Sequence, residues 1–366
     1  MSKIATYPTL TREECKDAIK AVGAGNKEAG IDPVTVLVMS EPGVGKSAIL
    51  EDLRMEMGED EYDFIYVDGP NKDMMDIAAT IPNHETKSLE HYVAGLFKMG
   101  NGKKKVIMID EALKVPKLMQ PIYTRLYQER TVGDEALPDG SMVFATTNNS
   151  SDGVGDNLQA HTANRVSIVR MSKPSFKEWA AWATDKGISP LITACCAMYP
   201  QVFRSYTEGD AQDNPYIFNP KRADQMSFVS PRSLHKCDGV IKKNLPYNMA
   251  LGLLAGLVGE SFARNLMSFV DLESKVTKFD DIIKDPDNAK MPAAGDSAPL
   301  LLMIFQAIEH IDSQDKLNKF QTFMNRVESH EIQSIWFVVL LRSKKAKMAR
   351  LNPLVAKWAA ENSHLL

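Results

Sequence analysis

A run of small and charged residues near the start of the chain has the composition of a phosphate-binding loop. Residues 40–47 read SEPGVGKS. Glycines let backbone N–H groups turn toward an anion, a lysine reaches the outer phosphates of a nucleotide, and a hydroxyl group can ligate Mg²⁺. The usual G-x-x-x-x-G-K-S/T pattern opens with glycine, whereas Ser40 stands there in this chain. A small residue is tolerable at that turn, so we predict a nucleotide site. Its expected phosphate-binding residues are Pro42, Gly43, Val44, Gly45, Lys46, Ser47 and Ala48.

Two adjacent carboxylates form the second part of the predicted site. The apolar segment VIMI, residues 106–109, ends in Asp110 and Glu111. Active-site groups of parallel sheets lie at the carboxyl ends of strands. We expect Asp110 to hold Mg²⁺ through water, with Ser47 as a second metal ligand. Glu111 would orient and deprotonate the water that attacks the γ-phosphate of ATP. The pair indicates ATP hydrolysis, because a kinase would have less use for the second carboxylate.

Apolar segments of strand length must position these groups. Residues 34–39 read VTVLVM and precede the loop, and helical spacing resumes at residues 48–55. Four further strands are predicted at 64–67, 106–109, 143–147 and 166–171. Apolar strands that alternate with helical segments predict a mostly parallel sheet covered on both faces.

Short sequence motifs predict the structure of the segments that connect these strands. Thr11 and Glu14 have the spacing of a capping box, which predicts a helix start at Thr11. Residues 71–102 are expected to be helical in parts, with breaks at Pro82 and Gly100. A helix is predicted over 116–129, and the turn residues of 130–142 indicate a hairpin or protruding loop.

The second half of the chain has the pattern of helices alone. Helices are predicted over 176–187, over 190–199, near residue 230, over 299–310, over 315–329 and over 331–350. Residues 249–271 are a long apolar helix or a helix pair, and 279–298 a loop around one short helix. These patterns divide the chain into a nucleotide-binding α/β domain (1–174), a helical lid (175–272) and a C-terminal helical extension (273–366).

The totals fit an ordinary globular protein that contacts neither lipid nor nucleic acid through bulk charge. The formal net charge is -4 and the isoelectric point is near 6.0, so nothing attracts the chain to polyanions as a whole. The four cysteines have no CxxC or metal-ligand spacing, which favours reduced thiols. The N-terminus lacks a hydrophobic signal core and no apolar run reaches membrane length. We therefore expect a cytoplasmic protein without membrane contact.

With these segments identified, the chain resembles the AAA+ ATPases, and more narrowly the MoxR-type ATPases of bacteria and phages, in the helix-2-insert clade. SEPGVGKS matches the Walker A motif and VIMIDE the Walker B motif. The further segments VFATTNN, LQAHTANRV and VSPRS follow in the family's order, and together these motifs cover about residues 34–235. The stretch FNPKRADQMSFVSPRS and the closing KWAAENS are also similar. The resemblance implies an AAA+ P-loop fold with a five-stranded, mostly parallel sheet, an all-helical lid and a C-terminal helical region.

The resemblance assigns roles to three polar residues. Asn148 matches sensor 1, which polarises the attacking water together with Glu111; Asn149 takes this place if the strand is slipped by one residue. Arg165 matches the arginine finger that reaches a neighbouring subunit's γ-phosphate, and Arg170 is the less favoured alternative.

Three more segments have counterparts in the family. Arg232 matches sensor 2, which senses nucleotide from the lid. Residues 78–99 resemble the helix-2 insert and residues 130–140 the pre-sensor hairpin of this clade.

The implied function is a ring-forming ATPase with a chaperone role. The cofactors would be ATP and Mg²⁺, and the ring a homo-oligomer, expected to be a hexamer. Its client would be a protein, by resemblance one with a von Willebrand factor A-type domain. Two other classes stay open. A phage-type nucleic-acid motor or loader is disfavoured by the acidic balance and the lack of an aromatic and basic platform. An ATP-gated scaffold with slow hydrolysis has Ser40 and Glu41 as its only hint.

Overall fold

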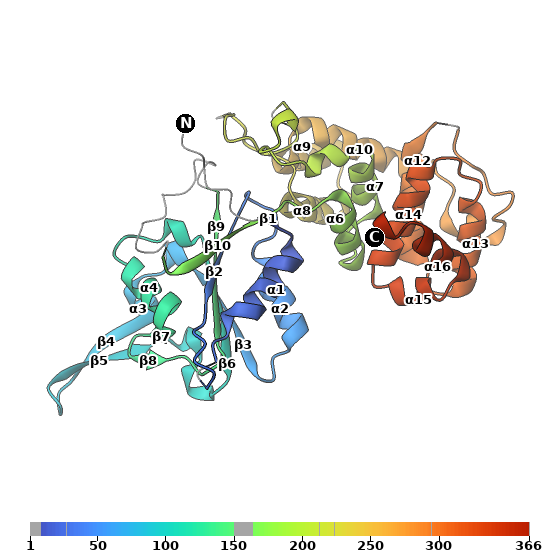
Figure 1. Ribbon diagram of the computed structural model, residues 1–366. Helices are drawn as coiled ribbons and strands as arrows, with labels where there is room; N and C mark the ends of the chain where they lie inside the picture. Colours follow the sequence, from blue (N-terminus) through green and yellow to red (C-terminus); the bar gives the residue numbers. More distant parts are fainter. Residues whose placement is uncertain are drawn as a thin grey trace. The chain divides into compact units, whose positions relative to one another are not determined.

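The computed structural model describes residues 9–26, 28–149, 164–211, 213–222, 224–293 and 295–365. The chain divides into two compact units, Met1–Lys173 and Pro174–Leu366 (Figure 1). The first holds the sheet and the second is helical. Among the described residues, no helix has both the length and the apolar character needed to cross a membrane.

The first unit is built on one parallel sheet. Six strands lie in the order β1-β10-β2-β9-β6-β3, and every neighbouring pair is parallel. Their bounds are β1 Thr9–Leu10, β2 Thr35–Ser40, β3 Tyr62–Asp68, β6 Lys104–Asp110, β9 Met142–Asn148 and β10 Val166–Met171. The predicted α/β P-loop fold is confirmed, with its five expected strands. The sixth strand, β1, was not predicted because two residues are too short to show a hydrophobic pattern.

Helices cover both faces of this sheet, because alternate strand residues point to opposite sides. Figure 1 shows α1 (Arg12–Gly23) and α2 (Ala48–Met57) on one side and α4 (Gln120–Glu129) on the other. The first face packs Val36, Val38, Phe64, Val106, Met108 and Phe144 against Ile19, Ile49 and Leu53. The second packs Leu37, Ile65, Val67, Ile107, Ile109, Val143 and Ala145 against Tyr123 and Leu126.

The helix starts follow the local sequence in one case and not in another. Thr11 caps α1 in the predicted capping box, since its hydroxyl accepts from the Glu14 N–H and Glu14 accepts from the Thr11 N–H. The helix expected over 116–129 instead begins at Gln120. Val115 is extended before Pro116, as a residue that precedes proline tends to be.

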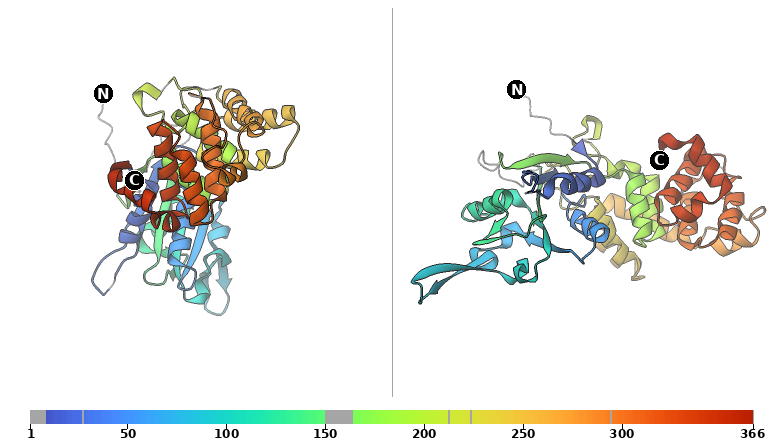
Figure 2. Two further views of the ribbon diagram at one scale, coloured as in Figure 1. Left: turned by 90° about the vertical axis from the view of Figure 1, so that its right-hand side faces the viewer. Right: turned by 60° about the horizontal axis from the view of Figure 1, so that its bottom comes forward.

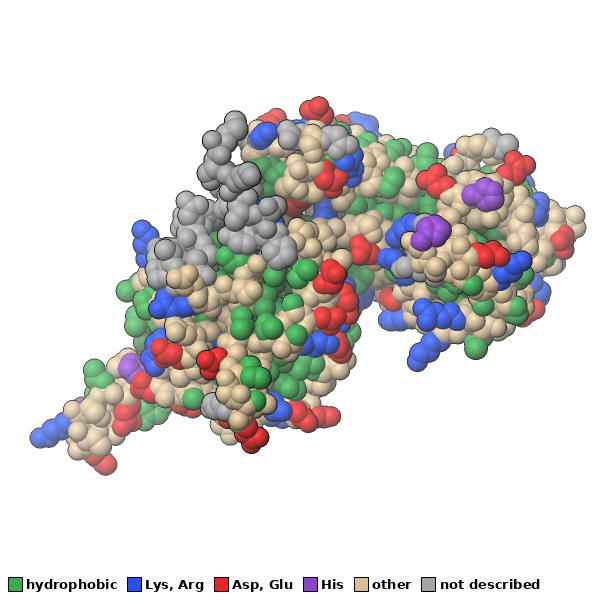
Figure 3. Space-filling view, in the orientation of Figure 1, with side chains coloured by type: hydrophobic (Ala, Val, Ile, Leu, Met, Phe, Trp, Pro, Cys, Tyr) green, Lys and Arg blue, Asp and Glu red, His purple; other side chains and the backbone are tan. Residues whose placement is uncertain are grey.

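The segment 71–102 is mostly not helical. Only α3 (Met74–Ile77) and short 3₁₀ turns are, whereas β4 (Ala78–Asn83) and β5 (Ser88–Val93) pair as an antiparallel hairpin. Pro82 is tolerated there because each strand of a two-stranded ribbon is an edge strand. The hairpin extends away from the sheet (Figure 1 and the right view of Figure 2), and its tip carries charges of both signs (Figure 3).

A second hairpin packs beside the first. As the turn residues predicted, β7 (Thr131–Val132) and β8 (Glu135–Ala136) pair across Gly133. His91 Nδ1 of β5 lies 2.7 Å from Asp134 Oδ2, and a Cβ at Gly133 would come within 3.3 Å of the His91 Cβ. The two hairpins therefore support each other.

The second unit is all helical. Its helices are α6 Phe176–Asp185, α7 Pro190–Met198, α8 Pro231–Ile241, α9 Tyr247–Val258, α10 Glu260–Glu273, α11 Phe279–Lys284, α12 Ser297–His310, α13 Gln314–Met324, α14 His330–Arg342, α15 Ala346–Arg350 and α16 Pro353–Glu361. The apolar segment 249–271 is a pair of helices broken at Gly259, whose φ is 85°. The single helix predicted over 331–350 is wrong. The chain leaves the helix at Ser343, whose hydroxyl bonds the backbone on both sides.

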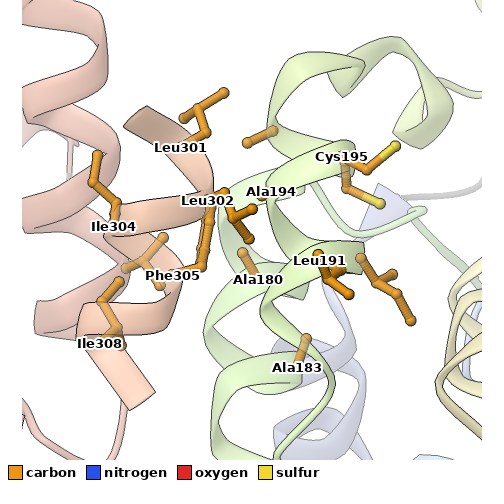
Figure 4. Packing of buried hydrophobic residues seen from close by; sticks show 14 of the residues in the cluster. Ala180, Ala183, Leu191, Ala194, Cys195, Leu301, Leu302, Ile304, Phe305 and Ile308 are labelled. Atoms are coloured by element: carbon orange, nitrogen blue, oxygen red, sulfur yellow. The ribbon is translucent and has the colours of Figure 1, made fainter. Parts of the chain in front are cut away.

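One hydrophobic core holds the helical unit together. Figure 4 shows Ala180 of α6 and Ala194 of α7 on the side that faces Leu302 and Phe305 of α12, and all four belong to one buried cluster. The same core continues from Phe176 to Val355. A boundary within this unit after residue 272 stays a prediction.

Candidate functional site

The predicted phosphate loop lies between β2 and α2. Gly43 and Gly45 have φ angles of 77° and 105°, which other residues adopt only with strain. The Ala48 N–H donates to the Gly45 carbonyl at 3.0 Å, so the first turn of α2 closes directly on the loop. The loop thus leads into the amino end of a ten-residue helix, where the helix dipole and backbone N–H groups favour an anion.

Strand register brings the other predicted groups to this loop. Ser40 at the end of β2 pairs with Asn148 at the end of β9. Ile109 of β6 pairs with Ala145 of β9, so that the next residue, Asp110, lies beside Thr146. Because β2, β9 and β6 are adjacent and parallel, their carboxyl ends form one edge.

Asn148 joins the loop lysine to the predicted catalytic carboxylate. Lys46 Nζ donates to Asn148 Oδ1 at 2.7 Å, and to Ser40 Oγ and the Glu41 carbonyl at 3.1 Å each. Asn148 Nδ2 donates to Glu111 Oε1 at 2.8 Å. Lys46 and Asn148 are both buried. The loop lysine and the predicted catalytic carboxylate are therefore connected through one amide.

Glu111 is held at both carboxylate oxygens. Its Oε2 lies 3.1 Å from Lys114 Nζ, while Asn148 donates to Oε1. The backbone of Glu111 is left-handed, with φ 51°, a conformation that is uncommon outside glycine and clusters at functional sites. Glu111 thus leaves the line of β6 with its side chain held by one hydrogen bond, from Asn148, and one ion pair, with Lys114.

Asp110 has three donors. Tyr66 donates its phenol hydrogen to Oδ2 at 2.9 Å. The Glu111 N–H donates to Oδ1 at 3.0 Å, and the Thr146 hydroxyl donates to the same oxygen. Sequence reasoning missed Tyr66 and Thr146. Strand alternation places Thr146 on the same face of β9 as Asn148, but no signal in the sequence places Tyr66 or Thr146 beside Asp110.

Of the two neighbouring asparagines, Asn148 has its side chain at Lys46 and Glu111. The Asn149 N–H donates to the Ser40 carbonyl at 3.1 Å. The geometry favours Asn148 for the sensor 1 role, which stays a prediction.

Arg165 lies at the opposite end of the sheet from the phosphate loop of its own chain. The next residue, Val166, pairs with Thr35 at the start of β2, whereas the loop follows Ser40. At about 3.3 Å per residue, these ends are about 17 Å apart. Arg165 Nε donates to Gln128 Oε1 at 2.7 Å. Of the quoted segment LQAHTANRV, residues 158–163 lie outside the described residues.

The remaining two candidate arginines differ in setting. Arg170 is within β10, opposite Met39. Arg232 is exposed in the first turn of α8, in the helical unit. Its part in nucleotide sensing stays a prediction.

The donors at this edge fit a nucleotide with Mg²⁺. Mg²⁺ prefers hard oxygen ligands, and Asp110 and Ser47 offer a carboxylate and a hydroxyl. Ser47 makes no capping hydrogen bond to α2, so its side chain is not committed to the helix end. The cation of Lys46 and the amino end of α2 suit phosphates.

Comparisons with known proteins show distant similarity only. No protein-family model and no curated protein matches the chain. The Thermotoga maritima RuvB Holliday junction branch migration motor is 14% identical over 76% of this chain and 74% of that chain, with a TM-score of 0.35. A proline-to-glycine mutant of it has 14% identity, coverages of 75% and 74%, and a TM-score of 0.38. Closed-state Hsp104 with ATPγS and FITC casein has 15% identity, coverages of 48% and 38%, and a TM-score of 0.33. The site described above rests on this chain's own geometry.

Proposed function

We propose that this chain is a magnesium-dependent ATP hydrolase of the AAA+ type that works as a ring of identical subunits. The observation that supports hydrolysis most directly is the connection Lys46–Asn148–Glu111 beside Asp110. It brings the Lys46 ammonium group and the carboxylates of Glu111 and Asp110 together at the carboxyl edge of three adjacent strands, which supports a phosphate-binding, a base and a metal-binding role for them.

Each residue then has a defined task. Lys46 and the loop N–H groups bind the outer phosphates, while Ser47 and Asp110 hold Mg²⁺, which neutralises charge on the phosphates. Glu111 takes the proton of the attacking water, and Asn148 orients Glu111. A phosphate oxygen that binds Lys46 competes with Asn148 Oδ1 for the same ammonium group. Nucleotide binding would thereby change what holds Glu111.

A neighbouring subunit would complete the site through Arg165. The strand geometry keeps Arg165 about 17 Å from its own phosphate loop, so it can serve only a nucleotide bound elsewhere. An arginine finger contributes on the order of 10³ to 10⁵ in turnover. Hydrolysis would therefore depend on assembly, for which we propose a hexameric ring.

The work of the ring would be done on a protein, as in MoxR-type chaperones. The β4–β5 hairpin exposes the apolar side chains of Ile81, Leu89 and Tyr92, which suits contact with a protein surface. Acidic and basic side chains are interspersed on the face shown in Figure 3, without a broad basic surface for nucleic acid. The client class we propose, from the resemblance alone, is a protein with a von Willebrand factor A-type domain.

Steady-state ATPase assays of Glu111→Gln and Arg165→Ala test this proposal. Glu111→Gln should bind ATP and hydrolyse it at least 10²-fold more slowly, and Arg165→Ala should lose about 10³-fold or more. A mixture of the two variants should regain activity, because mixed rings contain interfaces with both residues intact. Arg264→Ala, which removes an exposed arginine paired with Glu260, is the matched control.

Two results would count against the proposal. Wild-type rates in both variants would remove Glu111 and Arg165 from the reaction. Stimulation by DNA or RNA that falls steeply with salt would indicate a nucleic-acid motor instead.

A further inference from the structure

The carboxylate of Asp110 is fixed by two side chains that come from the strands on either side of it. Tyr66 is on β3 and Thr146 on β9, and both neighbour β6 in the sheet. Tyr66 donates to Oδ2 at 2.9 Å, and Thr146 donates to Oδ1. Each oxygen of the carboxylate therefore has a donor from a different strand, which determines the rotation of the group.

The placement follows from the pleat of the sheet. Met108 pairs with Tyr66 and with Phe144, and Asp110 and Thr146 each follow two residues later on their strands. Side chains two residues apart share a face, and here it is the face that packs against α2. The phosphate loop enters α2 on the same side. Thr147 points to the other face, where its buried hydroxyl has no hydrogen-bond partner.

The three hydrogen bonds leave the Asp110 carboxylate able to accept one more. An ionised carboxylate has about four acceptor sites, and the Glu111 N–H, Tyr66 and Thr146 use three of them. The remaining site can accept from a water molecule on the metal. The hydrogen bonds thus orient the carboxylate without saturating it.

We propose that Tyr66 and Thr146 are positioning residues that set the affinity of the site for Mg²⁺. The inference rests on the proposed function, in which Asp110 holds this ion. Mg²⁺ demands near-ideal octahedral geometry, so a carboxylate that can rotate binds it less well. Loss of outer partners of metal ligands typically costs 10- to 100-fold in metal affinity or activity.

The test is a Mg²⁺ titration of nucleotide binding, read from the fluorescence of a labelled ATP analogue. For Tyr66→Phe and Thr146→Val we expect the half-saturating Mg²⁺ concentration to rise about 10-fold each, and up to about 100-fold in the double variant. Affinity for the analogue in EDTA should stay within about twofold of wild type. A higher half-saturating Mg²⁺ concentration with unchanged affinity in EDTA separates metal positioning from general damage to the loop.

Each variant has a matched control on the same strand. Thr147→Val removes the hydroxyl that bonds nothing, and Tyr62→Phe removes a phenol hydroxyl at the other end of β3. Both should titrate like wild type. Thr146→Ser keeps the donor and should restore most of the Mg²⁺ affinity. If Thr146→Val folds poorly, Tyr66→Phe decides alone, because Tyr66 is 45% exposed and its ring is kept.

The two levels of the proposal fail in different ways. If wild type binds the analogue in a Mg²⁺-dependent manner and Tyr66→Phe matches Tyr62→Phe, the positioning role is wrong while the ATPase proposal stands. If wild type shows no Mg²⁺-dependent binding, both are wrong.

Discussion

Two buried lysines lie at opposite ends of the same sheet and differ in what surrounds them. Lys46 is 6% exposed and Lys105 is fully buried. Lys105, at the amino end of β6, donates to Asp63 Oδ2 at 2.7 Å, Asn101 Oδ1 at 2.6 Å and the Lys98 carbonyl at 2.9 Å. An ammonium group has three donors, and here all three are used.

The hydrogen bonds of Lys46 instead connect it to other residues of the candidate site. Its acceptors include the Asn148 amide, which also holds Glu111, and oxygens of the phosphate loop itself. These acceptors are uncharged, so a phosphate oxygen can replace any of them without leaving a carboxylate unpaired at that position. A buried lysine therefore indicates a functional site only when its hydrogen-bond partners also contact residues that could take part in a reaction. The Lys105 cluster ends in Asp63 and serves stability.

The largest expected effect is on stability, in Lys105→Met. The change leaves the carboxylate of Asp63 buried without its nearest cation, and breaking a buried ion pair costs about 3–5 kcal/mol. Urea unfolding should be followed by far-UV circular dichroism or by hydrogen exchange of β3 and β6. All four tryptophans lie in the helical unit: Trp179, Trp182, Trp336 and Trp358. Their fluorescence follows the helical unit, whereas hydrogen exchange of β3 and β6 follows the sheet.

Lys104→Met is the matched control for this prediction. Lys104 is the next residue along the strand and pairs with Glu61 at the surface, at 3.3 Å. Such pairs contribute about 0–1 kcal/mol. A loss in Lys105→Met no greater than that in Lys104→Met would contradict the structural role of the buried pair.

The second largest effect is expected in Lys46→Met, which should weaken ATP binding more than it lowers stability. A hydrogen bond to a charged group contributes about 1.5–3 kcal/mol, so affinity for ATP should fall roughly 10- to 100-fold. The unfolding free energy should fall by less than in Lys105→Met, because Lys105→Met leaves the buried Asp63 carboxylate without its nearest cation. Titration with a labelled ATP analogue, paired with the same urea experiment, checks both quantities. Unchanged affinity would show that Lys46, like Lys105, is structural.

The contrast between found and missed residues has a physical origin. Asp110, Glu111 and Asn148 could be predicted because each follows an apolar run, and the end of a strand is visible in one sequence. Tyr66 and Thr146 could not, because their contact with Asp110 depends on which strands are neighbours and in which register. One sequence contains neither.

The prediction of helices and strands is limited in the same way, because a single sequence shows only local patterns. β2, β9 and β10 are buried strands with continuous apolar runs, which length and composition identify. The β4–β5 hairpin has two short, mostly exposed strands, one with Pro82, so its pattern resembled broken helix. The helix α16 buries little beyond Val355 and showed no apolar stripe.

The smallest expected effect concerns the pH dependence of the stability that the Lys105–Asp63 pair contributes. Burial raises the pKa of Asp63, but hydrogen bonds from Lys105 and Asn101 lower it, and the net pKa lies below its usual range. A carboxyl group with a lowered folded-state pKa contributes stability above its unfolded pKa, about 3.9. That contribution disappears as pH falls through the lower, folded pKa.

Asp63→Asn measures this contribution directly. The difference in unfolding free energy between wild type and Asp63→Asn should be constant from pH 7 to about pH 5 and shrink below about pH 4. Glu61→Gln, at the exposed partner of Lys104, should differ from wild type by less than about 1 kcal/mol throughout. The decisive observation is the shape of the Asp63→Asn curve. If the difference in unfolding free energy between wild type and Asp63→Asn stays constant down to pH 3, Lys105 does not favour the ionised form of Asp63. The Lys105–Asp63 pair would then not be the ionic contact that distinguishes Lys105 from Lys46.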